Sequence, residues 1–358
     1  MRKAPTVLFV VFIPIFAMAA FGAQGGQTIR VAVKQVYLQV RAFDHGKSLK
    51  LRQENFRIWE EYKNEQGKVE KVEQAVEGFA RYESVPMALA VTIDSSGSMG
   101  LYTSSAAEVP RNKLELARNA SRNLFDSIFR EQKDRGLVSE FYFESPRHVD
   151  EGGKHLVILT NLTVKQSWTP NLKEIYDGLG KIRRAGGATP IRDSVFNLAQ
   201  HFREIDGDYL RVAVVLSDGE DAPDSARVGQ IKINSHSLEE VIRELQNHQV
   251  MVFSIALYNK PMLNIRFGRN RADTMQSLAE ETGGEAFYET DLSKLSGIFS
   301  KIGERIRDVN FLSYIPKSDI EGNRTIKVEV GEWDEKKEWH SQKASLHYRK
   351  GYYHKAQD

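Results

Sequence analysis

Three short apolar runs constrain the fold of this chain more than any other feature. They lie at residues 87–93, 210–216 and 250–257, and nearly every residue in them is hydrophobic. A strand with apolar side chains on both faces must be covered on both sides, as happens in parallel sheets that are flanked by helices. The three runs therefore predict a doubly wound α/β domain.

Amphipathic segments between these runs supply the expected helices. Apolar residues recur at helical spacing along residues 114–128 and 191–202, so each segment has one hydrophobic face. Ser237 and Glu240 have the spacing of a capping box, which predicts that a helix begins there. Strands that alternate with helices place the α/β domain at roughly residues 85–309.

The segments on either side of this domain have β character. Residues 29–40 and 325–330 carry apolar side chains at alternate positions, which is the pattern of half-buried strands, and residues 346–353 are rich in aromatic residues. We therefore expect β regions at residues 24–84 and 310–358. Either they pair to form one small β domain with the α/β domain inserted between its strands, or they are two separate extensions. The sequence leaves both arrangements open.

The first 23 residues have the features of a secretory signal peptide. Arg2 and Lys3 precede an apolar stretch that ends in small residues, with candidate cleavage sites after Ala19, Ala20 and Gly22. An uncleaved membrane anchor is the alternative, because the apolar stretch approaches the ~18 residues that span a bilayer. We expect a secreted or periplasmic protein, which contacts the membrane only if this segment is retained.

Composition excludes several classes of function. The chain has no cysteine, so it has no disulfides, no thiolate metal ligands and no cysteine nucleophile. Its 50 basic and 48 acidic residues give a net charge of only +2. Nucleic-acid binding normally needs a clustered basic excess, so we expect no nucleic-acid partner.

Oxygen-bearing side chains follow the buried strands at three places. Asp94, Ser96 and Ser98 come directly after the first run, Asp218 comes directly after the second, and Thr189 lies in a glycine-rich loop before a predicted helix. Ligands of doubly wound sheets gather at the carboxyl ends of the strands, so we expect these five residues to converge. Carboxylate and hydroxyl oxygens suit a hard divalent cation, Mg²⁺ or else Mn²⁺ or Ca²⁺. Two carboxylates do not overneutralise such an ion, which can therefore accept an external carboxylate.

This combination resembles the metal-ion-dependent adhesion site (MIDAS) of the von Willebrand factor A (VWA) family. The family's D-x-S-x-S motif falls on residues 94–98, its threonine on Thr189 and its later aspartate on Asp218. The resemblance covers about residues 86–308 and implies a Rossmann-like VWA fold. The flanking regions, including R-K-G-Y-Y at residues 349–353, are similar to a bacterial exported subgroup. The polar stretch at 144–154 is longer than the tight connection typical of the family.

The resemblance implies a binding protein without catalytic activity, in which an acidic side chain of a protein partner completes the coordination of the metal. A metal-dependent hydrolase or phosphotransferase using Asp94 is one alternative. It would normally need a second carboxylate where this chain has Ser96, and the G-x-S-x-G motif of serine hydrolases is also absent. A structural envelope protein is another alternative.

Simpler roles are also available for individual residues. Ser96 and Ser98 could cap a following helix, as serines often do. We expect Asp193 and Asp221 to stabilise loops, with Asp221 the stronger candidate for an additional ligand. The nine histidines show no metal-ligand spacing, so we expect them to be ordinary surface or core residues. The charged stretch at 334–338 reads as a solvated turn.

Overall fold

The structure is a computed structural model that describes residues 35–100, 112–143, 147–151, 154–158, 161–218, 221–222, 225–228, 231–257 and 273–355. The expected signal peptide at residues 1–23 lies outside these ranges. Among the described residues, no helix is both long enough and apolar enough to span a membrane.

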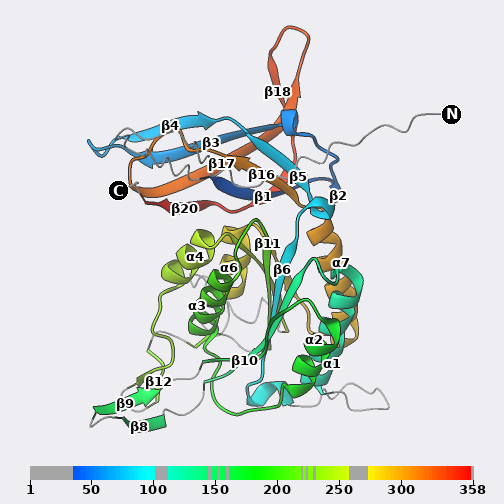
Figure 1. Ribbon diagram of the computed structural model, residues 1–358, viewed down its shortest axis with the longest axis vertical. Helices are drawn as coiled ribbons and strands as arrows, with labels where there is room; N and C mark the ends of the chain where they lie inside the picture. The colour runs from blue at the N-terminus through cyan, green and yellow to red at the C-terminus, as the bar shows by residue number, and fades with distance from the viewer. Residues whose placement is uncertain are drawn as a thin grey trace, which may run out of the picture. The chain divides into compact units, whose positions relative to one another are not determined.

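A six-stranded sheet forms the centre of the α/β domain (Figure 1). Its strands lie in the order β10 (Leu162–Thr169), β7 (Arg135–Phe141), β6 (Met87–Asp94), β11 (Leu210–Ser217), β14 (Val250–Ala256) and β15 (Glu285–Tyr288). All neighbours are parallel except β10 and β7, which are antiparallel. The chain continues from β6 toward β7 on one side, whereas β11 lies on the other. The switch point of the sheet is therefore between β6 and β11.

Helices cover both faces of this sheet, as Figure 1 shows. The α-helices in the described part of the chain are α1 (Lys113–Ile128), α2 (Leu172–Lys181), α3 (Ile191–His201), α4 (Leu238–Asn247), α6 (Thr274–Thr282) and α7 (Leu295–Arg307). One hydrophobic core joins α1, α2 and α7 to one face of the sheet, and a second joins α3, α4 and α6 to the other. Every residue of β6 and β14 is buried, as expected for strands between two helical layers. The predicted α/β fold is confirmed.

The helix ends follow local rules that the sequence shows. Ser237 Oγ accepts a hydrogen bond from Glu240 N, and Glu240 Oε2 accepts one from Ser237 N, so the predicted capping box begins α4. Helix α6 ends at Gly283, whose φ of +86° places it in the left-handed region. A Cβ there would lie 2.6 Å from the backbone of Tyr348, so glycine alone fits.

The flanking segments pair with each other in two sheets. The first has the order β19 (Ser345–Tyr348), β1 (Val36–Asp44), β16 (Asn310–Tyr314) and β5 (Gly78–Arg81), with β2 (Lys47–Ser48) on β1. The second has the order β18 (Trp339–Ser341), β17 (Gly322–Trp333), β3 (Phe56–Lys63) and β4 (Val69–Gln74), with β20 (Gly351–His354) on β17. Strands from before and after the α/β domain alternate in the first sheet, and in the second sheet β17 from after the domain pairs with β3 from before it. The alternative of two separate extensions is therefore wrong, and one β unit packs around a shared core.

Buried arginines join this β unit to the α/β domain. Arg349 Nη1 donates to the carbonyl of Gln246 at 2.7 Å, near the end of α4. Arg41 Nη2 donates to the carbonyl of Gly283 at 2.8 Å, where α6 ends. Because α4 and α6 lead into β14 and β15, these contacts lie at the amino ends of the strands. They leave the carboxyl ends, where the predicted site lies, to the loops alone.

Two edge features were not anticipated. Sequence patterns did not single out β7 or β10, and the antiparallel strand β10 forms one edge of the sheet. The polar stretch near residue 150 lies in the long connection between β7 and the edge strand β10. It forms a separate hairpin of β8 (Arg147–Glu151) and β9 (Lys154–Ile158). A second small hairpin joins β12 (Arg227–Val228) and β13 (Ile231–Lys232).

Candidate metal centre

The loop after β6 holds its polar groups close to the last residue of the strand. Asp94 is fully buried, and its Oδ1 accepts a hydrogen bond from Ser96 N at 2.8 Å. Residues Gly97–Gly100 then form a 3₁₀ turn. The N-cap of α1 is Asn112, so capping of that helix by Ser96 or Ser98 is wrong. The hydroxyls of both serines are available for other partners.

Hydrogen bonds connect this loop to the loop after β11. Ser98 Oγ lies 3.1 Å from Ser96 Oγ and donates to Asp218 Oδ1 at 2.6 Å. Ser217 Oγ donates to Asp94 Oδ2 at 2.6 Å. These contacts cross the switch point of the sheet and join residues about 120 positions apart in the chain. Four of the five predicted residues therefore lie in one hydrogen-bonded chain.

The fifth predicted residue, Thr189, lies in the loop between α2 and α3. Its carbonyl accepts from Ala222 N at 3.0 Å, just beyond the loop after β11. At the other end of the same loop, Ala185 N donates to the carbonyl of Ser95 at 2.7 Å. Gly187 has φ of +90°, and a Cβ there would lie 2.2 Å from the carbonyl oxygen of Phe143. The backbone of the Thr189 loop is thus held against both other loops.

Lys113 is a member of this cluster that sequence reasoning missed. It is the first residue of α1, and its ammonium group forms an ion pair with Asp218 Oδ2. The side chain of Asp218 is almost completely buried and that of Lys113 is 20% exposed. Asp94, Asp218 and Lys113 together carry a formal charge of −1.

Burial dominates the electrostatics of Asp94. It raises the pKa of this carboxyl to about 6, while hydrogen bonds from Ser217 and Ser96 act in the opposite direction. The negative charge of Asp218 raises the pKa slightly further. A carboxylate buried beside another carboxylate is costly unless a cation lies close by. The donors here are oxygens only, and such a set fits a hard divalent cation.

Two neighbouring acids serve the loops instead. Asp221 Oδ2 accepts from Arg192 Nε at 2.6 Å, and both side chains are more than nine-tenths buried. Asp193 accepts from the backbone nitrogens of Ser235 and His236, each at 2.9 Å. The expectation that Asp193 stabilises a loop is confirmed. Asp221 is likewise engaged in a buried ion pair.

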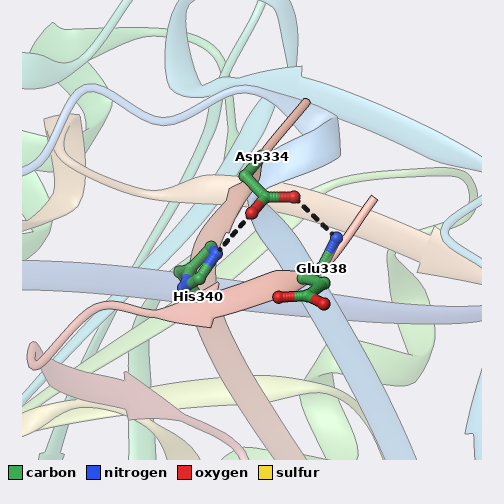
Figure 2. Close-up of side chains that lie close together, drawn as sticks. All are labelled: Asp334, Glu338 and His340. Atoms are coloured by element: carbon green, nitrogen blue, oxygen red, sulfur yellow. Dashed lines mark hydrogen bonds and ion pairs between the residues drawn. The ribbon is translucent and has the colours of Figure 1, made fainter. Parts of the chain in front are cut away.

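A second group of potential ligands lies far from these loops in the chain, in the turn between β17 and β18. Asp334, Glu338 and His340 lie close together and are mostly exposed (Figure 2). Asp334 Oδ1 accepts from the backbone nitrogens of Lys336 and Glu338, and Oδ2 pairs with His340 Nε2 at 2.9 Å. The geometry of an ordinary turn accounts for this arrangement, as expected for the charged stretch.

Comparison with known families identifies the fold. The sequence model of the von Willebrand factor type A domain matches residues 89–301, which is more than half of the chain. The chain belongs to the von Willebrand factor type A domain family. The residues matched in this VWA protein include all five predicted ligands and, of the six α-helices in the described ranges, five in full. No curated protein sequence matches the chain.

Solved structures similar to this VWA protein are distant. Proximal thread matrix protein 1 from the mussel byssus is 15% identical, with 67% of this chain and 51% of that chain covered and a TM-score of 0.44. The match therefore spans about half of that protein's length. A von Willebrand factor type A protein from Catenulispora acidiphila is 11% identical, with 90% of this chain and 75% of that chain covered and a TM-score of 0.41. The PilB minor pilin from Streptococcus sanguinis is 12% identical, with 77% of this chain and 88% of that chain covered and a TM-score of 0.42. Another structure of the byssus protein has a zinc-occupied MIDAS motif.

Proposed function

We propose that this VWA protein is an exported binding module without catalytic activity. In this proposal one divalent cation, Mg²⁺ or else Mn²⁺ or Ca²⁺, is held by Asp94, Ser96, Ser98, Thr189 and Asp218. When bound, the cation supplies an open coordination position for the carboxylate of a protein partner. Export would use the predicted signal peptide at residues 1–23.

The observation that carries this proposal is the hydrogen-bonded chain of side-chain oxygens across the switch point. It joins Asp94, Ser96, Ser98 and Asp218, and the backbone of the Thr189 loop is bonded to both neighbouring loops. No sulfur or imidazole ligand lies among the five predicted residues. Oxygen donors alone favour Mg²⁺, Ca²⁺ or Mn²⁺ over softer metals.

The charge of the site favours docking of an anion. Asp94 and Asp218 contribute two negative charges, and Lys113 returns one positive charge. A divalent cation would bring the total to +1. A carboxylate from outside is then attracted electrostatically, and the low local polarity around buried groups strengthens that attraction.

The same geometry gives little support to phosphotransfer through Asp94. Both of its oxygens already accept hydrogen bonds, Oδ1 from Ser96 N and Oδ2 from Ser217 Oγ. The side chain is fully buried, and the position two residues later is a serine instead of a carboxylic acid. These features suit a fixed metal ligand better than an attacking nucleophile.

Thermal unfolding tests the metal site. Mg²⁺, Mn²⁺ or Ca²⁺ should stabilise the folded protein by mass action and so raise its melting temperature. At a hundredfold excess of metal over the dissociation constant, the free energy of unfolding should increase by about 2.7 kcal/mol. EDTA should reverse the effect, and Asp94→Asn should abolish it. Asp134→Asn is a matched control, because Asp134 is also fully buried but binds Met87 N and Arg130 at the opposite edge of the sheet. That variant should lose stability and still respond to metal.

Peptide binding tests the docking step. The probe is a fluorescein-labelled nonapeptide, Gly-Ser-Gly-Ser-Asp-Ser-Gly-Ser-Gly, followed by fluorescence anisotropy at high protein concentration. Binding should require Mg²⁺ or Mn²⁺, and it should disappear with EDTA or when the peptide aspartate is replaced by asparagine. If Mg²⁺ raises the melting temperature but no peptide binds through its aspartate, the metal has only a structural role. That result would refute the docking proposal.

A further inference from the structure

We infer that a row of arginines beside the metal loops recognises additional carboxylates of the partner. This row, called here the arginine row, consists of Arg184, Arg183, Arg118 and Arg122. The inference rests on the proposed function, because the metal would hold one carboxylate of an acidic segment while the arginine row holds others. The occupant would be an acidic stretch of a protein.

The row begins within the loop that carries Thr189. Arg183 and Arg184 are both exposed and directly precede Ala185. Ala185 N donates to the carbonyl of Ser95, which adjoins Asp94. Consecutive Cα atoms are about 3.8 Å apart, so the backbone of Arg184 lies one residue from a direct contact with the metal-binding loop.

The row continues along a cleft between α1 and α2. This cleft has a volume of about 230 Å³ and is lined by Glu115, Arg118, Asn119, Arg122, Leu179 and Gly180. Arg118 Nη1 donates to the carbonyl of Ile182 at 3.2 Å, which joins the cleft to the start of the Thr189 loop. Arg122 is exposed one helical turn further along α1.

None of the four arginines forms an ion pair with a carboxylate among the residues that the structure describes. The guanidinium of Arg183 donates only to the backbone carbonyls of Gly180 and Ile182. Burial lowers the pKa of Arg118, and the positive charge of Arg183 lowers it further against a smaller opposite effect of Glu115. Other arginines of this chain have acidic partners, as Arg192 has in Asp221. Arg118 and Arg183 thus repel each other, and an external anion would relieve that repulsion.

Helix geometry gives the spacing of the expected carboxylates. Lys113 marks the metal site at the start of α1, and a helix rises about 1.5 Å per residue, so Arg118 and Arg122 lie about 7.5 and 13.5 Å further along. An extended peptide advances about 3.3 Å per residue. Additional acids at two and four residues from the metal-binding acid would therefore face the row.

The test compares the one-acid nonapeptide with two three-acid peptides. One has further aspartates at two and four positions after the central aspartate, and the other has them at two and four positions before it. At about 50 mM NaCl with saturating Mg²⁺, we expect one three-acid peptide to bind wild-type protein about tenfold more tightly than the one-acid peptide. In the double variant Arg183→Gln with Arg184→Gln this gain should fall to about twofold. High salt should also reduce it.

Two controls separate this effect from general charge and from misfolding. The double variant Lys63→Gln with Lys68→Gln removes the same charge from exposed positions on the β unit and should keep the full gain. Arg122→Gln changes one exposed helix residue and should reduce the gain partially. All variants should keep the wild-type melting shift with Mg²⁺.

The outcomes distinguish this inference from the proposed function. If all acidic peptides bind equally well and EDTA abolishes that binding, the inference is wrong and the metal-docking function stands. If the double variant keeps the tenfold gain, the inference is also wrong. If three-acid peptides bind through the arginines in EDTA as tightly as in Mg²⁺, the surface is a general polyanion site, and both the inference and the proposed function fail.

Discussion

The strands of the central sheet have polar groups at both their amino ends and their carboxyl ends, called here the amino edge and the carboxyl edge. The two differ in where the partners of these polar groups come from. At the amino ends of the strands, Arg41 and Arg349 of the β unit donate to backbone carbonyls near the ends of α6 and α4. At the carboxyl ends, the side chains of Asp94 and Asp218 meet hydroxyl groups and the single ammonium of Lys113.

This difference separates a structural cluster from a functional one. At the amino ends, Arg41 and Arg349 donate to backbone carbonyls, and Arg41 also forms an ion pair with Glu285, so the positive charge there comes from the chain itself. At the carboxyl edge, acceptor oxygens outnumber the available positive charge, and burial penalises the ionised Asp94. An excess of buried oxygen acceptors is stabilised by a cation from outside.

The amino edge should be sensitive to removal of a single arginine. Arg349 is 3% exposed, and Arg349→Ala would remove the buried guanidinium that donates to the carbonyls of Gln246 and Tyr37. Because two hydrogen bonds from a charged group are lost, we expect a loss of about 4 kcal/mol in the free energy of unfolding, measured by urea titration in EDTA. The melting shift produced by saturating Mg²⁺ should be unchanged. A variant that unfolds normally but no longer responds to metal would show that the two edges are coupled.

The carboxyl edge should have a pH dependence that originates in Asp94. Burial raises the pKa of its carboxyl from 3.8 to about 6, so in EDTA the folded state binds this proton more tightly than the unfolded state does. The contribution to stability is therefore greatest below about pH 4 and is lost as pH rises to about 6, by about 3 kcal/mol in total. Urea titrations of wild type and Asp94→Asn between pH 4 and 7 should show this slope in the wild type alone. Parallel pH profiles would contradict the assigned pKa.

Lys113 should weaken the binding of Mg²⁺ at this site and strengthen the binding of the acidic peptide to the metal-loaded site. In Lys113→Met the repulsion between the ammonium and the metal is removed, so Mg²⁺ should bind about tenfold more tightly by calorimetry. The loaded site then has no net charge, and the one-acid peptide should bind more weakly. Lys113→Arg retains the positive charge and serves as the control for both measurements. Weaker Mg²⁺ binding in Lys113→Met would contradict the charge argument.

The exposed turn should have the smallest effect. Asp334→Ala removes the acceptor for Lys336 N and Glu338 N, so a small loss of stability is expected. The Mg²⁺ dependence of the melting temperature should not change. If it does, the metal that stabilises this protein is held by Asp334, Glu338 and His340 instead of the loops at the switch point.

Much of the fold was predictable because its signals are local. Runs that are apolar on both faces predicted β6, β11 and β14, and the spacing of Ser237 and Glu240 predicted the start of α4. The pairing of β17 with β3 was not predictable. Alternating hydrophobicity shows that a strand has one buried and one exposed face, but it does not show which strand lies beside it. Strand β10 has no such apolar run, because most of its residues are only partly buried.

The candidate site divides in the same way. Asp94, Ser96 and Ser98 form a contiguous motif after a buried strand, and Asp218 follows the neighbouring strand, so their convergence followed from strand order. Lys113 has no such signal. Its contact with Asp218 depends on where α1 begins after the loop, which only the tertiary structure shows. The arginine row is likewise assembled from a helix and a loop that sequence patterns do not connect.

Anomalous diffraction from crystals grown with Mn²⁺ is the most direct test of the cation site. We expect one strong peak at the switch point, within about 2 to 2.5 Å of ligand oxygens from the loops after β6 and β11 or from ordered waters bound to them, and we expect its loss in Asp94→Asn. Absence of a peak at the switch point in well-ordered crystals, or a peak only at the turn between β17 and β18, would contradict it.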